Sequence, residues 1–370
     1  MSNVVKFWHN LGVNGFRFDA IKHIDKDFEN GINNGFCWGK KCVTFLKDLI
    51  NKSFLNNDNY FIFGESSGIS VAEIKKYGVG NNKVVHSFYN FAWWEIGWSK
   101  KTGRNGFDKN WDYKNFHVNM APFQNDINIS PDLMTIFLTN HDTSRAISRW
   151  GDLNYWKESA KALAIMQFIC KGIICIYQGE EIGMINVEFK NRNDFKDIDA
   201  LNAFDLLVDK KKIYTEEQLL KYMNINSRDC SRSPMHWNSE INYGFSKNKN
   251  TWIKMANDFN NQVNVEFQKK DSDSILLFYK KLIELYKSKD YQKIFVDGES
   301  DFELLDNGVF LWKRTNKQKS LIAYINITNQ TKKLETSINF EKVIISSYLQ
   351  KYNKTISRLN PYEAIIVLND

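Results

Sequence analysis

Short runs of apolar residues alternate with longer amphipathic segments through the first three quarters of the chain. The runs have the length and the β-branched or aromatic content typical of buried strands. They lie at residues 15–18, 60–65, 85–91, 134–139 and 173–178. Apolar residues at helical spacing occur at 38–54, 156–169 and 274–287. This alternation of strands and helices predicts an α/β fold built on a parallel sheet.

The pattern changes near residue 291. From there to residue 370, short runs of strand-forming residues such as SLIAYINIT and EAIIVLND are separated by Asn, Gly and Lys. Such spacing is typical of a small antiparallel β domain. We therefore expect two domains, at residues 1–290 and 291–370. Within the first, residues 184–260 form a long excursion rich in Asn and Lys, and long loops in compact domains are often functional.

Three acidic residues stand at the carboxyl ends of predicted strands: Asp19, Glu65 and Asp142. Taken singly, each could be a helix N-cap or an ion-pair partner. Arg17, however, lies two residues before Asp19, so both side chains share a face of the strand and the cation favours an ionised Asp. Three carboxylates at the ends of parallel strands indicate glycoside chemistry, which uses a nucleophile and a proton donor.

Longer segments around these acids carry a family resemblance. FRFDAIKHI, FGES and FLTNHD resemble the second, third and fourth signature segments of the α-amylase superfamily of glycoside hydrolases. IYQGEEIGMINVEF, SRDCSRSPMHWNSEINYGF and DSILLFYKKLIELYK are similar to the oligo-1,6-glucosidase and α-glucosidase branch. The resemblance covers nearly the whole chain. It implies a (β/α)8 barrel of which this chain holds strands 4 to 8, followed by a Greek-key β-sandwich domain.

The resemblance also implies roles for individual residues. Asp19 would be the nucleophile, Glu65 the general acid and then the general base, and Asp142 a binder of sugar hydroxyls that favours the distorted ring. Arg17 would position Asp19, and His141 would hydrogen-bond the sugar. Arg228 and Arg232 match a segment that borders the glucose pocket, and a salt bridge between barrel and loop is an equally open interpretation for both. No metal or other cofactor is expected.

The spacing of neighbouring strands bears on stereochemistry. Retaining hydrolysis needs the two working carboxyl groups about 5–5.5 Å apart, and adjacent strands lie about 4.8 Å apart. Asp19 and Glu65 follow consecutive predicted strands. We therefore predict retention of the anomeric configuration.

Five strands are fewer than the eight of a closed barrel. The family's first signature segment is also absent from the chain. We therefore expect the chain to be the C-terminal two thirds of a longer enzyme, with a missing N-terminal segment or a separate chain as a partner. An open remnant would expose a strand edge and apolar surface, both of which favour association.

Several functions stay open at this point. The first is an exo-acting α-glucosidase that hydrolyses α-1,6 or α-1,4 bonds of short isomaltose- or maltose-type oligosaccharides. The alternatives are an inactive remnant, a non-catalytic glucosidase-like binding protein, and a trehalose-6-phosphate hydrolase. In the resembling branch a Val after the nucleophile goes with α-1,6 preference. Ala20 takes that position here, which favours α-1,4 or broad action, whereas overall similarity favours α-1,6.

Composition excludes some classes. The net charge is +7, from 50 basic and 43 acidic residues, but the lysines are scattered, so nucleic acid is not an expected partner. No run of about 18 apolar residues exists, so no membrane span is expected. The five cysteines match no zinc or disulfide framework, which favours a reducing cytoplasm. Glu180 and Glu181 follow the last predicted strand, where salt bridging is the favoured interpretation.

Overall fold

The computed structural model describes residues 1–26, 36–54, 59–258, 261–317, 319–350 and 352–369. The chain divides into two compact units, and each contains separate stretches of sequence. Unit 1 comprises Met1–Ala92, Pro122–Ile136 and Lys171–Cys175, and unit 2 comprises Trp93–Ala121, Phe137–Cys170 and Ile176–Asp370. The predicted division at residue 290 is a different one and stays a prediction.

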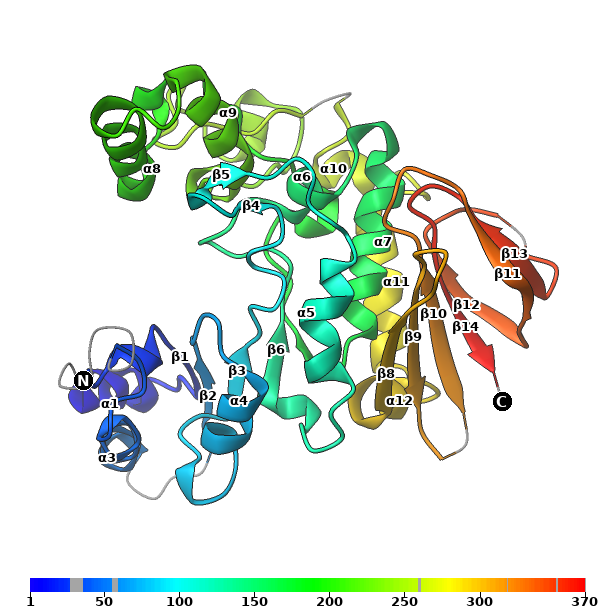
Figure 1. Ribbon diagram of the computed structural model, residues 1–370, viewed down its shortest axis with the longest axis horizontal. Coiled ribbons are helices and arrows are strands. Elements are labelled where there is room, and N and C mark those ends of the chain that lie inside the picture. The colour runs from blue at the N-terminus through cyan, green and yellow to red at the C-terminus, as the bar shows by residue number, and fades with distance from the viewer. Residues whose placement is uncertain (27–35, 55–58, 259–260, 318, 351, 370) are drawn as a thin grey trace. The chain divides into compact units, whose positions relative to one another are not determined.

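A five-stranded parallel sheet forms the centre of unit 1 (Figure 1). Its strands, in spatial order, are β1 (Gly15–Phe18), β2 (Phe61–Gly64), β3 (Ser87–Tyr89), β6 (Met134–Ile136) and β7 (Ile173–Ile174). All five predicted strands are therefore confirmed, although most are shorter than their apolar runs. The runs at 134–139 and 173–178 extend beyond β6 and β7, and their residues from Phe137 and from Ile176 belong to unit 2.

Among the described residues of unit 1, the α-helices are α1 (Ser2–Asn10), α3 (Cys42–Phe54) and α4 (Val71–Gly78). The helical stripe predicted at 38–54 is confirmed by α3, which buries Cys42, Leu46 and Phe54. A capping box of Ser70 and Glu73 begins α4. Helix α1 is different, because it leaves Phe7 and Trp8 about half exposed, at 58% and 50%. Strand β1 has one strand neighbour, β2, among the described residues.

Unit 2 holds most of the remaining helices, and α5 (Asn115–Gln124) has residues in both units. The other α-helices described in unit 2 are α6 (Ala146–Trp150), α7 (Trp156–Ile169), α8 (Ile198–Ala203), α9 (Glu216–Asn226), α10 (Val265–Gln268), α11 (Ile275–Lys287) and α12 (Gln292–Asp297). The predicted helices at 156–169 and 274–287 are confirmed by α7 and α11. No helix in the described parts of the chain has the length and apolar character needed to cross a membrane.

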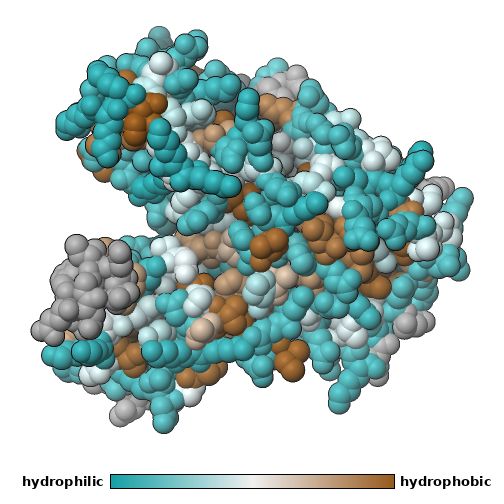
Figure 2. Space-filling model, in the orientation of Figure 1, coloured by the Kyte–Doolittle hydropathy of each residue, from teal (hydrophilic) through white to brown (hydrophobic). Residues whose placement is uncertain are grey.

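The polar excursion contains more regular structure than its composition suggested. It holds α8, a π-helix at Phe204–Lys210 and α9, and its surface is mainly hydrophilic on the face drawn in Figure 2. A capping box of Thr215 and Gln218 begins α9, and Leu219 and Met223 are buried. Only two apolar side chains per helix face inward, which explains why the amphipathic pattern was too weak to predict these helices.

The C-terminal strands form antiparallel sheets, as the sequence predicted. One has five strands in the order β12-β14-β10-β9-β8, and β11 pairs with β13 in the other. The bounds are β8 (Glu299–Leu304), β9 (Phe310–Thr315), β10 (Ser320–Ile325), β11 (Lys332–Asn339), β12 (Lys342–Ser346), β13 (Thr355–Leu359) and β14 (Ala364–Asn369). Residues of both sheets share one apolar core that includes Tyr324, Leu334, Ile356 and Val367. Buried Arg314 of β9 donates to the backbone carbonyl of Ile169 in α7, which links sheet and helix.

Candidate active site

In unit 1, Asp19 and Glu65 directly follow the neighbouring strands β1 and β2. Phe18 and Gly64 are register partners at the strand ends. The backbone ladder continues past them, because the amide of Glu65 donates to the carbonyl of Phe18 over 2.8 Å and the amide of Ile21 donates to the carbonyl of Glu65 over 3.0 Å. The two acids are therefore the next residues on adjacent parallel strands, as the sequence predicted.

Arg17 contacts Asp19 directly. Its Nη1 donates to Asp19 Oδ1 over 2.7 Å, and its guanidinium lies 5.7 Å from the centre of the Tyr89 ring. Both Arg17 and Asp19 remain partly exposed, with 32% and 72% of their side chains accessible. An exposed pair of this kind contributes little to folding stability. Its main consequence is geometric, since it holds one oxygen of Asp19 and leaves the other available.

Glu65 is held by the backbone. Its Oε2 accepts from the amide of Ala20 over 2.7 Å, and its Oε1 accepts from the amide of Ser67 over 3.2 Å. Ala20 has a φ of +47°, in the left-handed region, and in this conformation its N–H reaches Glu65. The residue after the candidate nucleophile therefore positions the candidate acid, a link that the sequence did not reveal.

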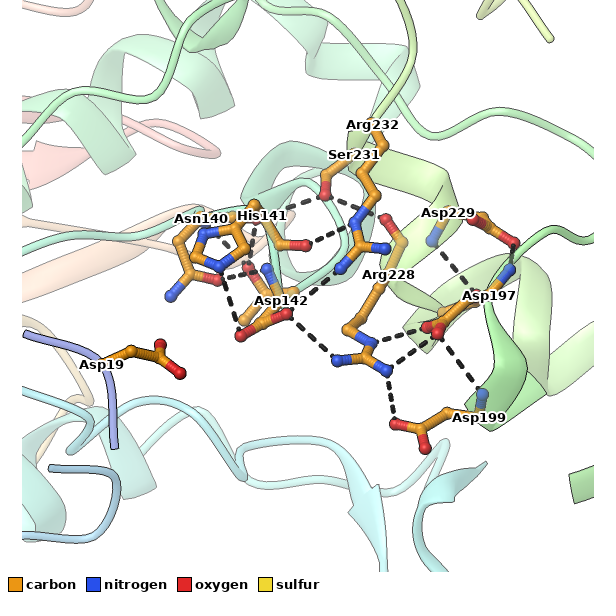
Figure 3. Close-up of polar contacts among 12 residues, drawn as sticks. Asp19, Asn140, His141, Asp142, Asp197, Asp199, Arg228, Asp229, Ser231 and Arg232 are labelled. Carbon is orange, nitrogen blue, oxygen red and sulfur yellow. Dashed lines mark hydrogen bonds and ion pairs between the residues drawn. The ribbon is translucent and has the colours of Figure 1, made fainter. Parts of the chain in front are cut away.

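In unit 2, Asp142 lies in a loop after β6, and two arginines and a histidine approach its carboxylate (Figure 3). Its Oδ1 accepts from Arg228 Nη1 and from Arg232 Nη2, each over 3.2 Å. His141 Nε2 is 3.4 Å from its Oδ2. The loop is shaped by Asn140, whose Oδ1 accepts from the amide of Asp142. An ionised carboxylate accepts about four hydrogen bonds, so Asp142 keeps capacity for ligand hydroxyls.

Arg228 connects Asp142 to two further acids. Its Nε and Nη2 donate to the two oxygens of Asp197 over 2.6 and 2.8 Å, and its Nη2 also donates to Asp199 over 2.8 Å (Figure 3). The hydrogen bonds with Asp197 raise the pKa of the Arg228 guanidinium. Arg104 forms an ion pair with Asp199, while burial lowers the pKa of Arg104.

The structure thus confirms the salt-bridge interpretation of Arg228 and Arg232, and their role in a sugar pocket stays a prediction. Sequence reasoning missed Asp197, Asp199 and Arg104 as members of this network. Asp197 lies 31 positions from Arg228, and nothing in the surrounding KDIDALNAF segment marks it as a partner. Only the fold of the polar excursion brings these side chains together.

Glu180 and Glu181 do not form the salt bridges that the sequence favoured. Neither has an ion-pair partner in the part of the chain that the structure describes, and one oxygen of each is buried without a hydrogen-bond partner. Glu180 Oε2 accepts from the amide of Tyr177 over 3.1 Å. Burial raises the pKa of Glu180 to about 8. The turn after β7 therefore carries a carboxyl group that stays protonated at neutral pH.

This burial predicts a pH-dependent stability. The pKa of Glu180 is about 8 in the folded chain and near 4.5 when exposed, so the fold disfavours ionisation. The contribution of Glu180 to the free energy of unfolding is fully present below pH 4.5. This contribution is lost as the pH rises towards 8, by up to about 1.4 kcal/mol per pH unit. The Glu180→Gln variant cannot ionise. Its melting temperature should exceed that of the wild type increasingly from pH 5 to pH 8, measured by calorimetry.

The exposed Glu303→Gln change is the matched control, because it removes the same charge from a strand surface. Its melting temperature should follow the wild type at every pH. A difference between Glu180→Gln and wild type that is constant across this range would contradict the assignment.

Comparison with known proteins places these residues in context. Residues 1–298 match the family model described as the catalytic domain of alpha amylase. The probable oligo-1,6-glucosidase 2 of Bacillus subtilis (strain 168) is 30% identical over 390 aligned positions, which cover 100% of this chain and 67% of that protein. The oligo-1,6-glucosidase of Heyndrickxia coagulans is 28% identical over an alignment that covers 98% of this chain and 66% of that protein.

Solved structures give the same relationship. The trehalose-6-phosphate hydrolase of Bacillus licheniformis superimposes with a TM-score of 0.85 at 27% identity, over 99% of this chain and 67% of that one. The isomaltulose synthase of Klebsiella sp. LX3 superimposes with a TM-score of 0.87 at 25% identity, over 100% and 67%. The chain spans about two thirds of the length of the proteins it matches.

Proposed function

Because this chain belongs to the alpha-amylase family of glycoside hydrolases, we propose that it acts on terminal α-glucosidic bonds of short oligosaccharides, with α-1,6 and α-1,4 linkages as the candidate substrates. The observation that supports this most directly is the pair of acids on adjacent strands, Asp19 with its Arg17 partner and Glu65 with its two backbone donors. The proposed activity is that of the complete enzyme. Residues of this chain have the following roles in it.

The proposed reaction has two steps. Asp19 attacks the anomeric carbon from the β face while Glu65 gives its proton to the departing glycosidic oxygen, which leaves a β-glucosyl ester on Asp19. Glu65, now ionised, takes a proton from water, and the water oxygen displaces Asp19 from the α face. Two inversions retain the α configuration. Asp142, whose Oδ1 accepts from Arg228 and Arg232, accepts hydrogen bonds from sugar hydroxyls with its remaining acceptor positions.

We also propose that the five parallel strands are strands 4 to 8 of a (β/α)8 barrel, completed by further β/α units. Two observations support this: among the described residues β1 has one strand neighbour, and α1 exposes aromatic side chains. A strand edge without a partner and an apolar helix face both favour a covering segment. The five cysteines are free, which supports a reducing compartment such as the cytoplasm.

The test is hydrolysis of p-nitrophenyl α-glucoside, maltose, isomaltose and trehalose 6-phosphate by the purified chain. Each assay is run alone and with the part of the Bacillus subtilis relative that this chain does not match. Release of glucose from maltose or isomaltose in either arrangement supports the proposal. Folded protein that hydrolyses none of these substrates in both arrangements would favour an inactive remnant or a binding protein, and trehalose 6-phosphate as the sole substrate would favour the phosphorylated class.

Ala20 offers a test of linkage preference. A valine here adds bulk beside the nucleophile and is expected to raise the isomaltose-to-maltose rate ratio severalfold. Because Ala20 has a φ of +47°, a β-branched residue should also lower the free energy of unfolding by about 1 kcal/mol relative to alanine. Ala20→Gly is the control, since glycine suits this conformation and adds no bulk. An unchanged ratio in a folded Ala20→Val enzyme would contradict the role of this position.

A further inference from the structure

Arg145 is a fully buried cation three residues after Asp142. Its side chain is 2% exposed, and it lies at the start of α6 in unit 2. Its Nη1 donates to the carbonyl of Gln178 over 3.0 Å, and its Nη2 donates to the carbonyl of Ser231 over 3.3 Å. No carboxylate forms an ion pair with it among the described residues. A buried arginine that donates to backbone carbonyls is a structural connector, since each bond fixes a different segment.

Ser231 gives this connection its importance. It ends the 3-10 turn Arg228–Ser231 and directly precedes Arg232, so the turn carries both arginines that contact Asp142 Oδ1. The Ser231 hydroxyl donates to the carbonyl of Asn140, in the same loop as Asp142. Arg145 therefore follows the loop of Asp142 in the sequence, and its guanidinium holds the carbonyl of Ser231, next to the two arginines that contact this acid.

The backbone of Arg145 adds a second link to the same region. Its amide donates to Asn186 Oδ1 over 2.8 Å. The Nδ2 of Asn186 donates to the carbonyls of Asn224 and Ile225, at the end of α9, over 2.9 and 3.1 Å. Helix α9 leads directly into the Arg228–Ser231 turn. The two ends of the turn are thus linked to Arg145 in different ways, one by its guanidinium at Ser231 and the other by its backbone amide through Asn186 and the end of α9.

The site is shaped to admit a guanidinium. Gly179 has a φ of +77°, and a Cβ at this position would lie 2.9 Å from Arg145 Nη1 and 2.5 Å from the sulfur of Met184. The Tyr177 ring lies 5.7 Å from the guanidinium carbon. Burial opposes the charge on Arg145 and lowers the pKa of its guanidinium. A side chain kept charged at such a cost is expected to have a specific task.

We propose that Arg145 is a positioning residue for Asp142: it fixes the Arg228–Ser231 turn so that Arg228 and Arg232 stay on one oxygen of the Asp142 carboxylate. The Asp142 carboxylate then keeps one orientation, and its unused acceptor positions point in a fixed direction. This inference rests on the proposed role of Asp142 in binding sugar hydroxyls. A displacement of about 1 Å in such a group lowers the rate about a hundredfold.

The test compares Arg145→Met with Arg149→Met. Arg149 is the matched control, because it is also buried and its guanidinium donates to two backbone carbonyls, those of Trp94 and Ile96. Among the described residues, this guanidinium forms no hydrogen bond or ion pair with the Asp142 network. Hydrogen exchange measured by mass spectrometry reports the two segments directly. In Arg145→Met the peptides that cover 140–145 and 226–233 should exchange about tenfold faster than in Arg149→Met, and Arg145→Lys should restore part of the protection.

Activity is the second readout. On the most rapidly hydrolysed substrate, kcat of Arg145→Met should fall about a hundredfold, more than that of Arg149→Met. Equal exchange of the two peptides in both methionine variants would overturn the inference, as would faster exchange with an undiminished kcat. If the wild-type chain hydrolyses nothing, the exchange result still decides whether Arg145 holds the turn, so failure of the proposed function and failure of this inference are told apart. Should Arg145→Met fail to fold, the same comparison is made with Arg145→Lys.

Discussion

Replacement of Asp19 by alanine is expected to lower kcat on every glucoside by at least about a thousandfold, because the proposed mechanism forms its covalent intermediate on the Asp19 carboxylate. Asp19 is 72% exposed on its side chain and its ion pair with Arg17 is at the surface, so the fold should be unaffected. The measurement is kcat with p-nitrophenyl α-glucoside, together with a melting curve. Asp48→Ala, which removes an exposed acid of α3, is the control and should leave kcat within about twofold.

Added azide makes this test specific for a nucleophile. In Asp19→Ala the space on the β face of the sugar is empty, and azide can attack the anomeric carbon there as p-nitrophenolate leaves. The expected product is β-glucosyl azide, with activity partly restored. Azide that restores nothing, or a variant that keeps more than a tenth of the wild-type kcat without it, would contradict the assignment of Asp19.

Replacement of Glu65 by alanine should have an effect that depends on the leaving group. A sugar leaves poorly without a proton, so hydrolysis of maltose or isomaltose should fall by about a hundredfold or more. Nitrophenolate leaves without protonation, so formation of the glucosyl-enzyme from p-nitrophenyl α-glucoside should be affected much less. Steady-state and burst kinetics on the two substrates separate these effects. Azide should now attack the glucosyl-enzyme from the α face and give α-glucosyl azide.

Glu65→Gln is the structural control for this experiment. Glutamine keeps an oxygen that can accept from the amide of Ala20 but cannot supply a proton at neutral pH. It should therefore reproduce the substrate dependence of Glu65→Ala with a fold closer to wild type. Equal losses on both classes of substrate in the two variants would mean that Glu65 only orders the backbone around Ala20.

Sequence reasoning located the strands that carry the acids, because short apolar runs ending in a charged residue are distinctive. It also predicted that Arg17 and Asp19 share a face, since side chains two positions apart in a strand do so. The register of Phe18 with Gly64 then brings Asp19 and Glu65 to adjacent positions. These parts of the site depend on local sequence and on one strand pairing.

The parts of the candidate site that sequence reasoning missed depend on contacts between segments that are distant in the sequence. The pairing of Asp197 with Arg228 and of Arg104 with Asp199 results from how the polar excursion folds, and charge patterns in such a segment resemble a solvated surface. Likewise, an arginine in a TSRAIS segment is typical of an exposed helix start, yet Arg145 is buried. The left-handed conformation of Ala20 was equally hidden, because alanine rarely adopts it.

The anomer released first from the substrate tests the central claim most directly. Proton NMR during the first minutes of maltose or p-nitrophenyl α-glucoside hydrolysis distinguishes α- from β-glucose before the two interconvert in solution. The proposed pair, with Asp19 as nucleophile and Glu65 as acid and base on adjacent strands, predicts α-glucose as the initial product. Initial release of β-glucose would contradict it, since a single displacement by water does not use a covalent bond to Asp19.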